Sequence, residues 1–225
     1  MAIEKENPKN LAKLLEFRLR ISAIDLNKLA FLDEFRVELS EADRPDRCRS
    51  IQEDKKYSRS HQPRVYSKVY KARRRRAWSV ITFMHSRGMD RGLAVEGSVN
   101  RFVMRAYLLE IVIQEFKALG IEYVIAARPV RCRFRQDMDN LSVHKTKEVR
   151  EVLEEHGIEV IYTPPYSPEC NAIEEGISKV KNEIRSNSDK NAENMVDLIG
   201  KALDHVTESN TRGFIKHWQK MTMQS

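Results

Sequence analysis

Three acidic side chains follow or begin segments that could bring carboxylates together. Asp33 comes directly after the apolar run Leu29 to Leu32, Asp139 closes a region with strand character, and Glu174 lies at the start of a helical pattern. Hard divalent cations such as Mg²⁺ take carboxylate oxygens rather than thiolates as ligands. Binding of such a cation is therefore the chemistry that these residue types offer.

Neighbouring acids compete with two of these positions. Asp25 or Glu34 could replace Asp33, although adjacent residues of a strand point to opposite faces, so Asp33 and Glu34 should not both reach one site. Asp137 would share a strand face with Asp139.

Glu174 also has two competing interpretations. Glu175 is its alternative by one residue in register. Because Glu174 lies three residues after Asn171, it could instead be the acidic member of a capping-box-like helix start.

The elements that must position these acids alternate along the chain. Helical spacing covers residues 8–27, and residues 40–63 are polar with the character of a loop. Between them, residues 28–35 hold a short apolar strand whose C-terminal end carries the acids Asp33 and Glu34. Further elements are expected in this order: strand 77–85, a turn, strand 92–99, a helix 101–119 capped by Asn100, a strand region 121–139, helix 143–156, strand 158–163, a helix from about 171 that buries Ile173, Ile177, Val180 and Ile184, and helical stretches 191–206 and 212–221. This order predicts an α/β fold, a ribonuclease-H-like mixed five-stranded sheet with flanking helices.

Composition excludes several classes of protein. The longest apolar run, 123–127, has five residues, whereas a transmembrane helix needs about 20. The first residues include acids and no apolar block, which is not typical of a secretory signal. Cys48, Cys132 and Cys170 form no CxxC pair, which indicates reduced thiols rather than a disulfide framework or zinc site.

The positive charge is concentrated in one window. The 225 residues carry 40 Lys and Arg against 33 Asp and Glu, a net charge of +7, and residues 51–90 alone hold 11 basic and three acidic side chains. The window is centred on Lys71, Arg73, Arg74, Arg75 and Arg76. Such a cluster can bind nucleic-acid phosphates through counterion release, with a solvated loop or a nuclear-import signal as the alternatives.

Two motifs are longer and more specific. One is Asp139-Asn140 followed by His144-Lys145; the other is Pro164-Pro165-Tyr166-Ser167-Pro168, then Asn171, then Ile173-Glu174. Thirty-four residues separate Asp139 from Glu174. With the strand that ends in Asp33-Glu34, these motifs resemble the catalytic domain of the mariner-like (Tc/mariner) transposases of the DDE-type superfamily, and the resemblance covers residues 28–186.

The resemblance implies that Asp33, Asp139 and Glu174 are the catalytic residues and bind two Mg²⁺ or Mn²⁺ ions. Two ions about 3.5–4 Å apart can act on both the attacking and the leaving oxygen of a phosphodiester. One would activate water or a DNA 3′-hydroxyl, and the other would stabilise the departing oxyanion. His144 and Lys145 match the family's His-Lys pair and are expected to contact DNA.

The same resemblance implies a transposase catalytic domain, a metal-dependent DNA endonuclease and strand transferase that acts on transposon ends and target DNA. Its members act as homodimers or larger synaptic assemblies. A nuclear location is expected in a eukaryotic host, and a cytoplasmic or nucleoid one in a bacterium. The alternatives are an inactive or domesticated DNA-binding or partner-binding derivative, and a structure-specific nuclease that acts on RNA or hybrids.

Some features depart from the family pattern. Arg131, Arg133 and Arg135 alternate through what should be a central strand, where burial of charge is costly. Residues 123–127 are the better strand, so about ten residues near 127–136 could be an insertion. Ala172 stands where the family usually has proline. About 27 residues precede the first strand, too few for the family's paired helix-turn-helix modules.

The expected division of the chain has three parts. Residues 1–27 form a helical extension, residues 28–186 the catalytic domain with a basic insertion near 40–76, and residues 187–225 the C-terminal helices.

Overall fold

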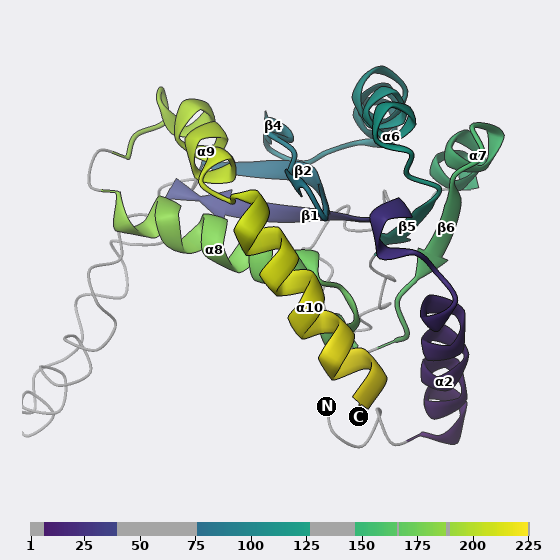
Figure 1. Cartoon of the computed structure of the whole chain (residues 1–225). Coiled ribbons are helices and arrows are strands. Elements are labelled where there is room, and N and C mark those ends of the chain that lie inside the picture. Colours follow the sequence, from purple (N-terminus) through teal and green to yellow (C-terminus); the bar gives the residue numbers. More distant parts are fainter. Residues whose placement is uncertain (1–6, 40–75, 127–146, 166, 188–189, 225) are drawn as a thin grey trace, which may run out of the picture.

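A mixed β-sheet lies at the centre of the molecule (Figure 1). The computed structural model describes residues 7–39, 76–126, 147–165, 167–187 and 190–224. The strands are β1 (Leu29–Glu38), β2 (Ala77–His85), β3 (Gly88–Met89), β4 (Leu93–Glu96), β5 (Tyr123–Ala126) and β6 (Glu159–Tyr162). They are ordered β3-β2-β1-β5-β6, with β4 also paired to β2. The predicted α/β class and mixed sheet are confirmed.

The first strand is longer than predicted. β1 does not end at Asp33 but continues to Glu38, because β2 pairs with it antiparallel from Ala30 opposite His85 to Glu38 opposite Ala77. Its parallel pairing with β5 extends only from Leu29 to Leu32 among the described residues. Asp33 is therefore the first residue of β1 beyond that parallel pairing.

The predicted hairpin forms, with β4 inside the predicted strand 92–99. Gly88 and Met89, expected in the turn, pair with β2 as the short strand β3, so that the sheet has six strands rather than five. Between β3 and β4, the backbone N–H of Asp90 donates to the carbonyl of Phe83, and the Thr82 hydroxyl donates to the carbonyl of Asp90. Gly92 follows with φ of +69°. This local detour interrupts the ladder between β3 and β4.

The predicted helices are present with shifted ends. They are α2 (Pro8–Ser22), α5 (Arg101–Tyr107), the π-helical segment η3 (Leu108–Val112), α6 (Ile113–Leu119), α7 (Lys147–Glu155), α8 (Ile173–Ser186), α9 (Met195–Asp204) and α10 (Glu208–Gln224), with short 3₁₀ turns η1 (Leu26–Lys28) and η5 (Pro168–Cys170). Asn100 caps α5 as predicted, because its side chain accepts hydrogen bonds from the N–H groups of Phe102 and Val103. Gly120, with φ of +71°, ends α6.

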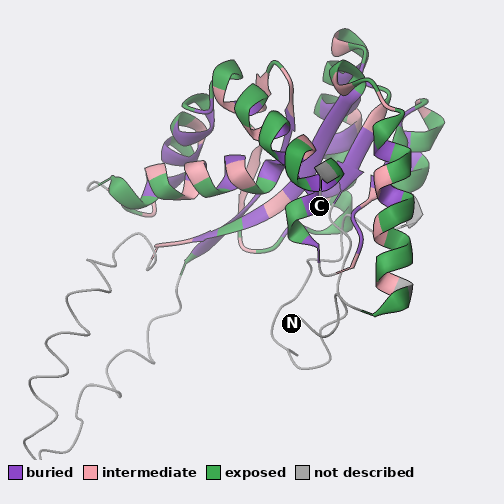
Figure 2. Cartoon of the chain, turned by 60° about the horizontal axis from the view of Figure 1, so that its bottom comes forward, coloured by how far each residue is buried: buried purple, intermediate pink, exposed green. Residues whose placement is uncertain are grey.

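Two apolar clusters hold these layers together, one on each face of the sheet. The first joins α2, α8, α9 and α10 to the face of β1 that carries Phe31 and Phe35. The second joins α5, η3, α6 and α7 to the opposite face, which carries Ala30 and Leu32. Figure 2 shows the buried residues gathered in the strands and on the helix sides that meet them. The sheet is covered on both faces, as its continuous apolar strands require.

Helix α8 lies close against the sheet. All four residues predicted to be buried on it, Ile173, Ile177, Val180 and Ile184, are buried. A Cβ at Gly176 would lie 3.1 Å from Met89 Sδ and 3.4 Å from Met84 Sδ. A glycine in the second turn therefore brings the start of α8 close to β2 and β3.

Several sequence predictions concern residues that lie outside the described ranges. These are the polar segment 40–63, most of the basic window, the arginine-alternating stretch and proposed insertion at 127–136, and two of the cysteines, Cys48 and Cys132. The three-part division of the chain stays a prediction. No helix within the described ranges is long and apolar enough to cross a membrane.

Candidate functional site

Asp33 is a buried carboxylate in the middle of the sheet. Only 8% of the residue is exposed. Its Oδ1 accepts a hydrogen bond from the backbone N–H of Glu34 at 2.8 Å, and its Oδ2 accepts one from the Asn171 side-chain amide at 2.9 Å. The apolar neighbours of Asp33 on its face, Phe31 and Phe35, belong to the cluster under α8 and α10. The strand alternation therefore directs Asp33 toward the C-terminal helices.

The competing acids near Asp33 are placed differently. Asp25 is exposed and caps η1, since its Oδ1 accepts from the backbone N–H and the side-chain amide of Asn27. Glu34 follows Asp33 directly on the strand, so its side chain belongs to the opposite face. Of these three acids, Asp33 is the one that contacts the start of α8.

The turn before α8 brings Asn171 to Asp33. Pro168 opens the 3₁₀ turn η5, after which Asn171 has an extended backbone, and α8 begins at Ile173. The N-cap of α8 is Ala172, which makes no side-chain cap. The capping-box interpretation is therefore wrong: the Asn171 side chain bonds to Asp33, 138 residues away, and not to the first turn of its own helix.

Glu174 lies in the first turn of α8, three residues after Asn171. It is exposed, yet partial loss of solvent around its carboxyl raises the pKa of Glu174, and Lys181 opposes that shift. Glu174 and Asn171 line a pocket of about 250 Å³ with Pro168, Trp218 and Met221. The first turn of α8 thus presents a carboxylate at the pocket beside the Asp33–Asn171 pair.

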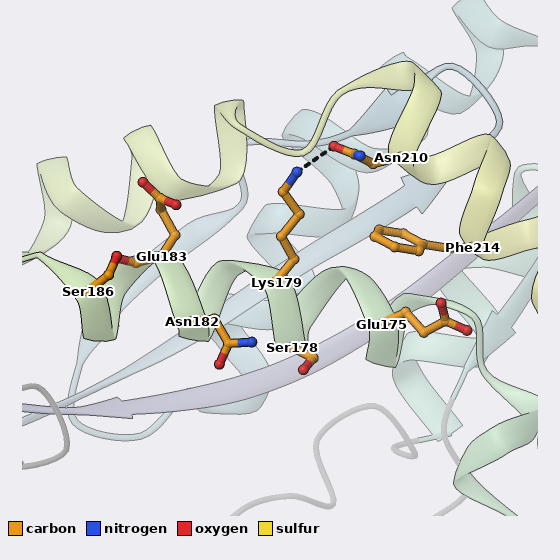
Figure 3. Close-up of a pocket in the computed structure, with 8 residues that line it drawn as sticks. All are labelled: Glu175, Ser178, Lys179, Asn182, Glu183, Ser186, Asn210 and Phe214. Atoms are coloured by element: carbon orange, nitrogen blue, oxygen red, sulfur yellow. Dashed lines mark hydrogen bonds between the residues drawn. The ribbon is translucent and has the colours of Figure 1, made fainter. Parts of the chain in front are cut away.

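Glu175, the alternative in register, has a different partner. Its Oε1 lies 2.6 Å from Nδ1 of His217 on α10. Glu175 also lines a wider pocket of about 660 Å³ between α8 and α10, where Lys179 donates a hydrogen bond to Asn210 at 2.6 Å (Figure 3). Glu175 therefore joins two helices, which leaves Glu174 as the acid beside Asn171.

Other predicted site residues lie outside the described ranges. These are the acids Asp139 and Asp137, the motif residues Tyr166, His144 and Lys145, and the basic residues Lys71, Arg73, Arg74 and Arg75. Arg76 is described: it is exposed, and its Nε lies 3.0 Å from a carboxylate oxygen of Glu96 on β4. The described ranges contain no cluster of three or more His, Cys, Asp or Glu side chains that could hold a metal.

The donor atoms that are described fit a hard divalent cation. Asp33 and Glu174 supply carboxylate oxygens. Asn171 Oδ1 is a buried oxygen that accepts no hydrogen bond within the described part of the chain. Asn171 itself is only 3% exposed. Oxygen ligands of these types are those of Mg²⁺ and Mn²⁺ sites.

Sequence reasoning missed the role of Asn171 in the site. The residue enters the sequence predictions only as part of the second motif and as the start of the alternative capping-box interpretation of Glu174. The one signal in the sequence was that this asparagine lies within the motif, three residues before Glu174.

Comparisons with known proteins identify the family to which this site belongs. The family model described as DDE superfamily endonuclease matches residues 28–196. No curated protein matches the sequence. Nineteen solved chains match the structure.

Three of these structures are from the Mos1 mariner transposase. Its paired-end complex with Mn gives a TM-score of 0.67 at 15% identity, over 96% of this chain and 61% of that one. Its strand transfer complex gives 0.65 at 12% identity, over 95% and 58%. Its catalytic domain with Raltegravir and Mn gives 0.63 at 10% identity, over 98% and 94%.

This chain thus spans about 60% of the longer Mos1 chains and nearly all of the Mos1 catalytic domain, with which it shares its fold. The family match covers both β1 with Asp33 and the start of α8 with Asn171 and Glu174. The chain belongs to the DDE superfamily of endonucleases.

Proposed function

We propose that this chain is the catalytic domain of a mariner-like transposase, a metal-dependent DNA endonuclease and strand transferase that acts on transposon ends and target DNA. The observation that carries the proposal is the contact between buried Asp33 and Asn171, three residues before Glu174, inside the region that matches the endonuclease family. It connects Asp33 to the segment that leads into Glu174, 141 positions further along the sequence.

Asp33, Glu174 and Asp139 would hold two Mg²⁺ or Mn²⁺ ions. When bound, the ions would supply Lewis-acid stabilisation of the charge that develops on phosphate oxygens. The sheet would contribute to this stabilisation by holding Asp33 buried and oriented before any ion binds. Preorganised charge of this kind needs no rearrangement during the reaction. Mos1 structures obtained with Mn and with Mg support this choice of ion.

The DNA partner, the assembly and the location are parts of the same proposal. The Mos1 structures include paired-end and strand transfer complexes, which supports DNA as the substrate. The basic residues Lys71 to Arg76, with His144 and Lys145, would contact phosphates. We further propose a homodimer or larger synaptic assembly, and a nuclear location if the host is eukaryotic.

A nicking assay tests the catalytic proposal. The purified chain, with Mg²⁺ or Mn²⁺, is expected to nick supercoiled duplex DNA, and Asp139→Ala and Glu174→Gln are expected to lose that activity. Glu183→Gln is the matched control, because it changes another acid of α8, nine residues further along the helix, which pairs with His205. Equal nicking by wild type and Asp139→Ala, or none by any protein although DNA and metal bind, would leave an inactive derivative of the fold.

A further inference from the structure

The contact between Asn171 and Asp33 is unusual in three respects. Both residues are buried, at 3% and 8% exposure. The hydrogen bond joins the central strand to the segment that starts the C-terminal helices. The other end of the amide, Oδ1, is buried and accepts no hydrogen bond from any described group.

A purely structural role explains only part of this. A buried polar group without a partner costs about 1–3 kcal/mol, so an asparagine kept only to satisfy Asp33 would leave its own oxygen uncompensated. An asparagine kept to cap α8 would bond to the first turn, which it does not do. The position of the residue suggests another role: its Nδ2 bonds to the Asp33 carboxylate, and Asn171 lines the same pocket as Glu174.

We propose that Asn171 is a positioning residue of the metal site. Its Nδ2 fixes the orientation of the Asp33 carboxylate relative to a cation, and its Oδ1 stays available to a ligand of the loaded site. Because Asn171 is three residues before Glu174, the same contact sets the distance between β1 and the acid of α8. This inference rests on the proposed function.

Metal affinity provides the test. Mn²⁺ binding to the full chain can be followed through the electron paramagnetic resonance signal of free Mn²⁺, without DNA and without turnover. Asn171→Ala is expected to weaken Mn²⁺ binding about 10-fold or more, since loss of a partner that orients a metal ligand costs roughly 10–100-fold in affinity. Asn182→Ala is the matched control, because Asn182 is an exposed asparagine of α8 that accepts a hydrogen bond from Arg185; its affinity should equal that of the wild type.

The outcomes separate this inference from the proposed function. If the wild type binds no Mn²⁺, or if Asp33→Asn binds it as well as the wild type does, the proposed metal site is wrong. If the wild type binds Mn²⁺ and Asn171→Ala binds it equally well, only the role of Asn171 is wrong. Circular dichroism at the same temperature establishes that each variant is folded. Asn171→Ser, whose shorter side chain cannot span the contact, gives the same comparison should the alanine variant unfold.

A second, independent feature is a line of basic residues on α10. Arg212, Lys216 and Lys220 follow at four-residue intervals, which places them on one side of a helix. Arg212 pairs with Glu208, the only acidic residue of α10. Lys216 and Lys220 are exposed, and no acidic side chain in the described ranges pairs with them.

The surface beside these lysines is hollowed and leads toward the candidate site. Lys216, His217 and Lys220 line a pocket of about 500 Å³ on α10. His217 also lines the smaller pocket that Glu174 and Asn171 share. The two pockets therefore share His217, and the pocket beside the lysines of α10 adjoins the pocket at the start of α8.

We infer that Lys216 and Lys220 of this line, with the neighbouring His217, bind the phosphate backbone of a DNA strand that enters the site of Glu174. The charge of the two lysines is complementary to phosphate, and their positions lie outside the basic window predicted from sequence. Each phosphate that a lysine neutralises releases counterions, so the contact contributes to the salt dependence of binding. This inference, too, rests on the proposed function.

The test compares two double variants with the same loss of charge. Lys216→Ala with Lys220→Ala is expected to weaken binding of a fluorescent DNA duplex, and to reduce the slope of log affinity against log salt by about 1.8, at roughly 0.9 for each phosphate contact. Lys117→Ala with Lys201→Ala removes two exposed lysines from α6 and α9 and is expected to keep the wild-type slope.

Binding is measured by anisotropy without divalent metal, so that no cleavage is involved. An equal slope for the wild type and the α10 variant would overturn the inference. An equal decrease of this slope in both double variants would also overturn it, since it would indicate that the overall charge of the protein, and not the position of the two lysines, sets the slope. Failure of the wild type to bind DNA at all would instead contradict the proposed function.

Discussion

Two buried side chains of the described residues, on opposite sides of the sheet, have specific hydrogen-bond partners. Asp33 accepts hydrogen bonds on both carboxylate oxygens, and the Tyr107 hydroxyl donates to Asp90 Oδ2 at 2.8 Å on the other side of the sheet. Burial first, and then the negative charge of Asp90, raise the pKa of Tyr107 far above its usual value. These contacts predict effects on stability at single residues.

Tyr107→Phe is expected to lower the free energy of unfolding by about 1–3 kcal/mol, because a hydrogen bond to a carboxylate is lost while Asp90 keeps the N–H of Gly92. It should also change the pH dependence. Above about pH 10 the unfolded chain loses the tyrosine proton and the folded chain retains it, so wild-type stability falls as pH rises. Urea unfolding at pH 8 to 11 measures both effects.

The alkaline fall in stability should be less steep for Tyr107→Phe than for the wild type. The control is Tyr123→Phe, which also removes one tyrosine hydroxyl, but from a half-buried position on β5. An alkaline fall that is equally steep in Tyr107→Phe and the wild type would contradict the argument.

At the scale of the elements, the helix starts and strand ends decide where the acids lie. The long pairing of β1 with β2 holds Asp33 rigidly, and the short turn η5 leads directly into α8. The interrupted strand β3–β4 shows how closely such elements approach one another. A Cβ at Gly92 would lie 2.5 Å from the carbonyl oxygen of Ile81 on β2.

Gly92→Ala is therefore expected to destabilise the protein markedly. The left-handed backbone alone costs an L-residue about 1–2 kcal/mol, and the clash with Ile81 adds to it. Gly97→Ala is the control: its φ is +93°, but nothing lies within 4 Å of the added Cβ. Thermal melts should show a larger loss for Gly92→Ala than for Gly97→Ala, and the reverse order would contradict the role of the close approach.

Asn100→Ala is expected to cost about 1 kcal/mol of unfolding free energy, because the N–H groups of Phe102 and Val103 lose their acceptor at the start of α5. Denaturant titration measures this loss. Asn100→Ser, which restores a capping oxygen, should recover most of it. No difference between the alanine and serine variants would indicate that the cap does not contribute.

At the scale of the whole molecule, the apolar core is spread over many elements, whereas the excess positive charge is concentrated in one part of the sequence. The sheet and its two apolar clusters provide the rigid scaffold, whereas the positive excess of the sequence is in residues 51–90. Replacement of Arg73 to Arg76 by alanine is expected to weaken DNA binding and to flatten its salt dependence. Arg76 already pairs with Glu96, so restoring Arg76 alone should recover little of the slope. An unchanged slope in the four-residue variant would assign the run to import or solubility.

Much of this could be predicted from the sequence. Hydrophobic spacing located the strands and helices, because local patterns reflect which side of an element is buried, and α8 buries all four of the residues that its spacing selected. The motifs around Asp139 and Glu174 identified the family that the comparison then showed. Strand alternation alone separated Asp33 from Glu34.

The tertiary structure decided what depends on contacts between distant segments. Pairing with β2 carried β1 five residues past Asp33, and no pattern within β1 contains that information. Likewise, the partner of Asn171 is 138 residues away, so local sequence could offer only its own helix as a partner. A sequence lists which groups are available nearby, but only the packed sheet determines which buried donor and acceptor meet.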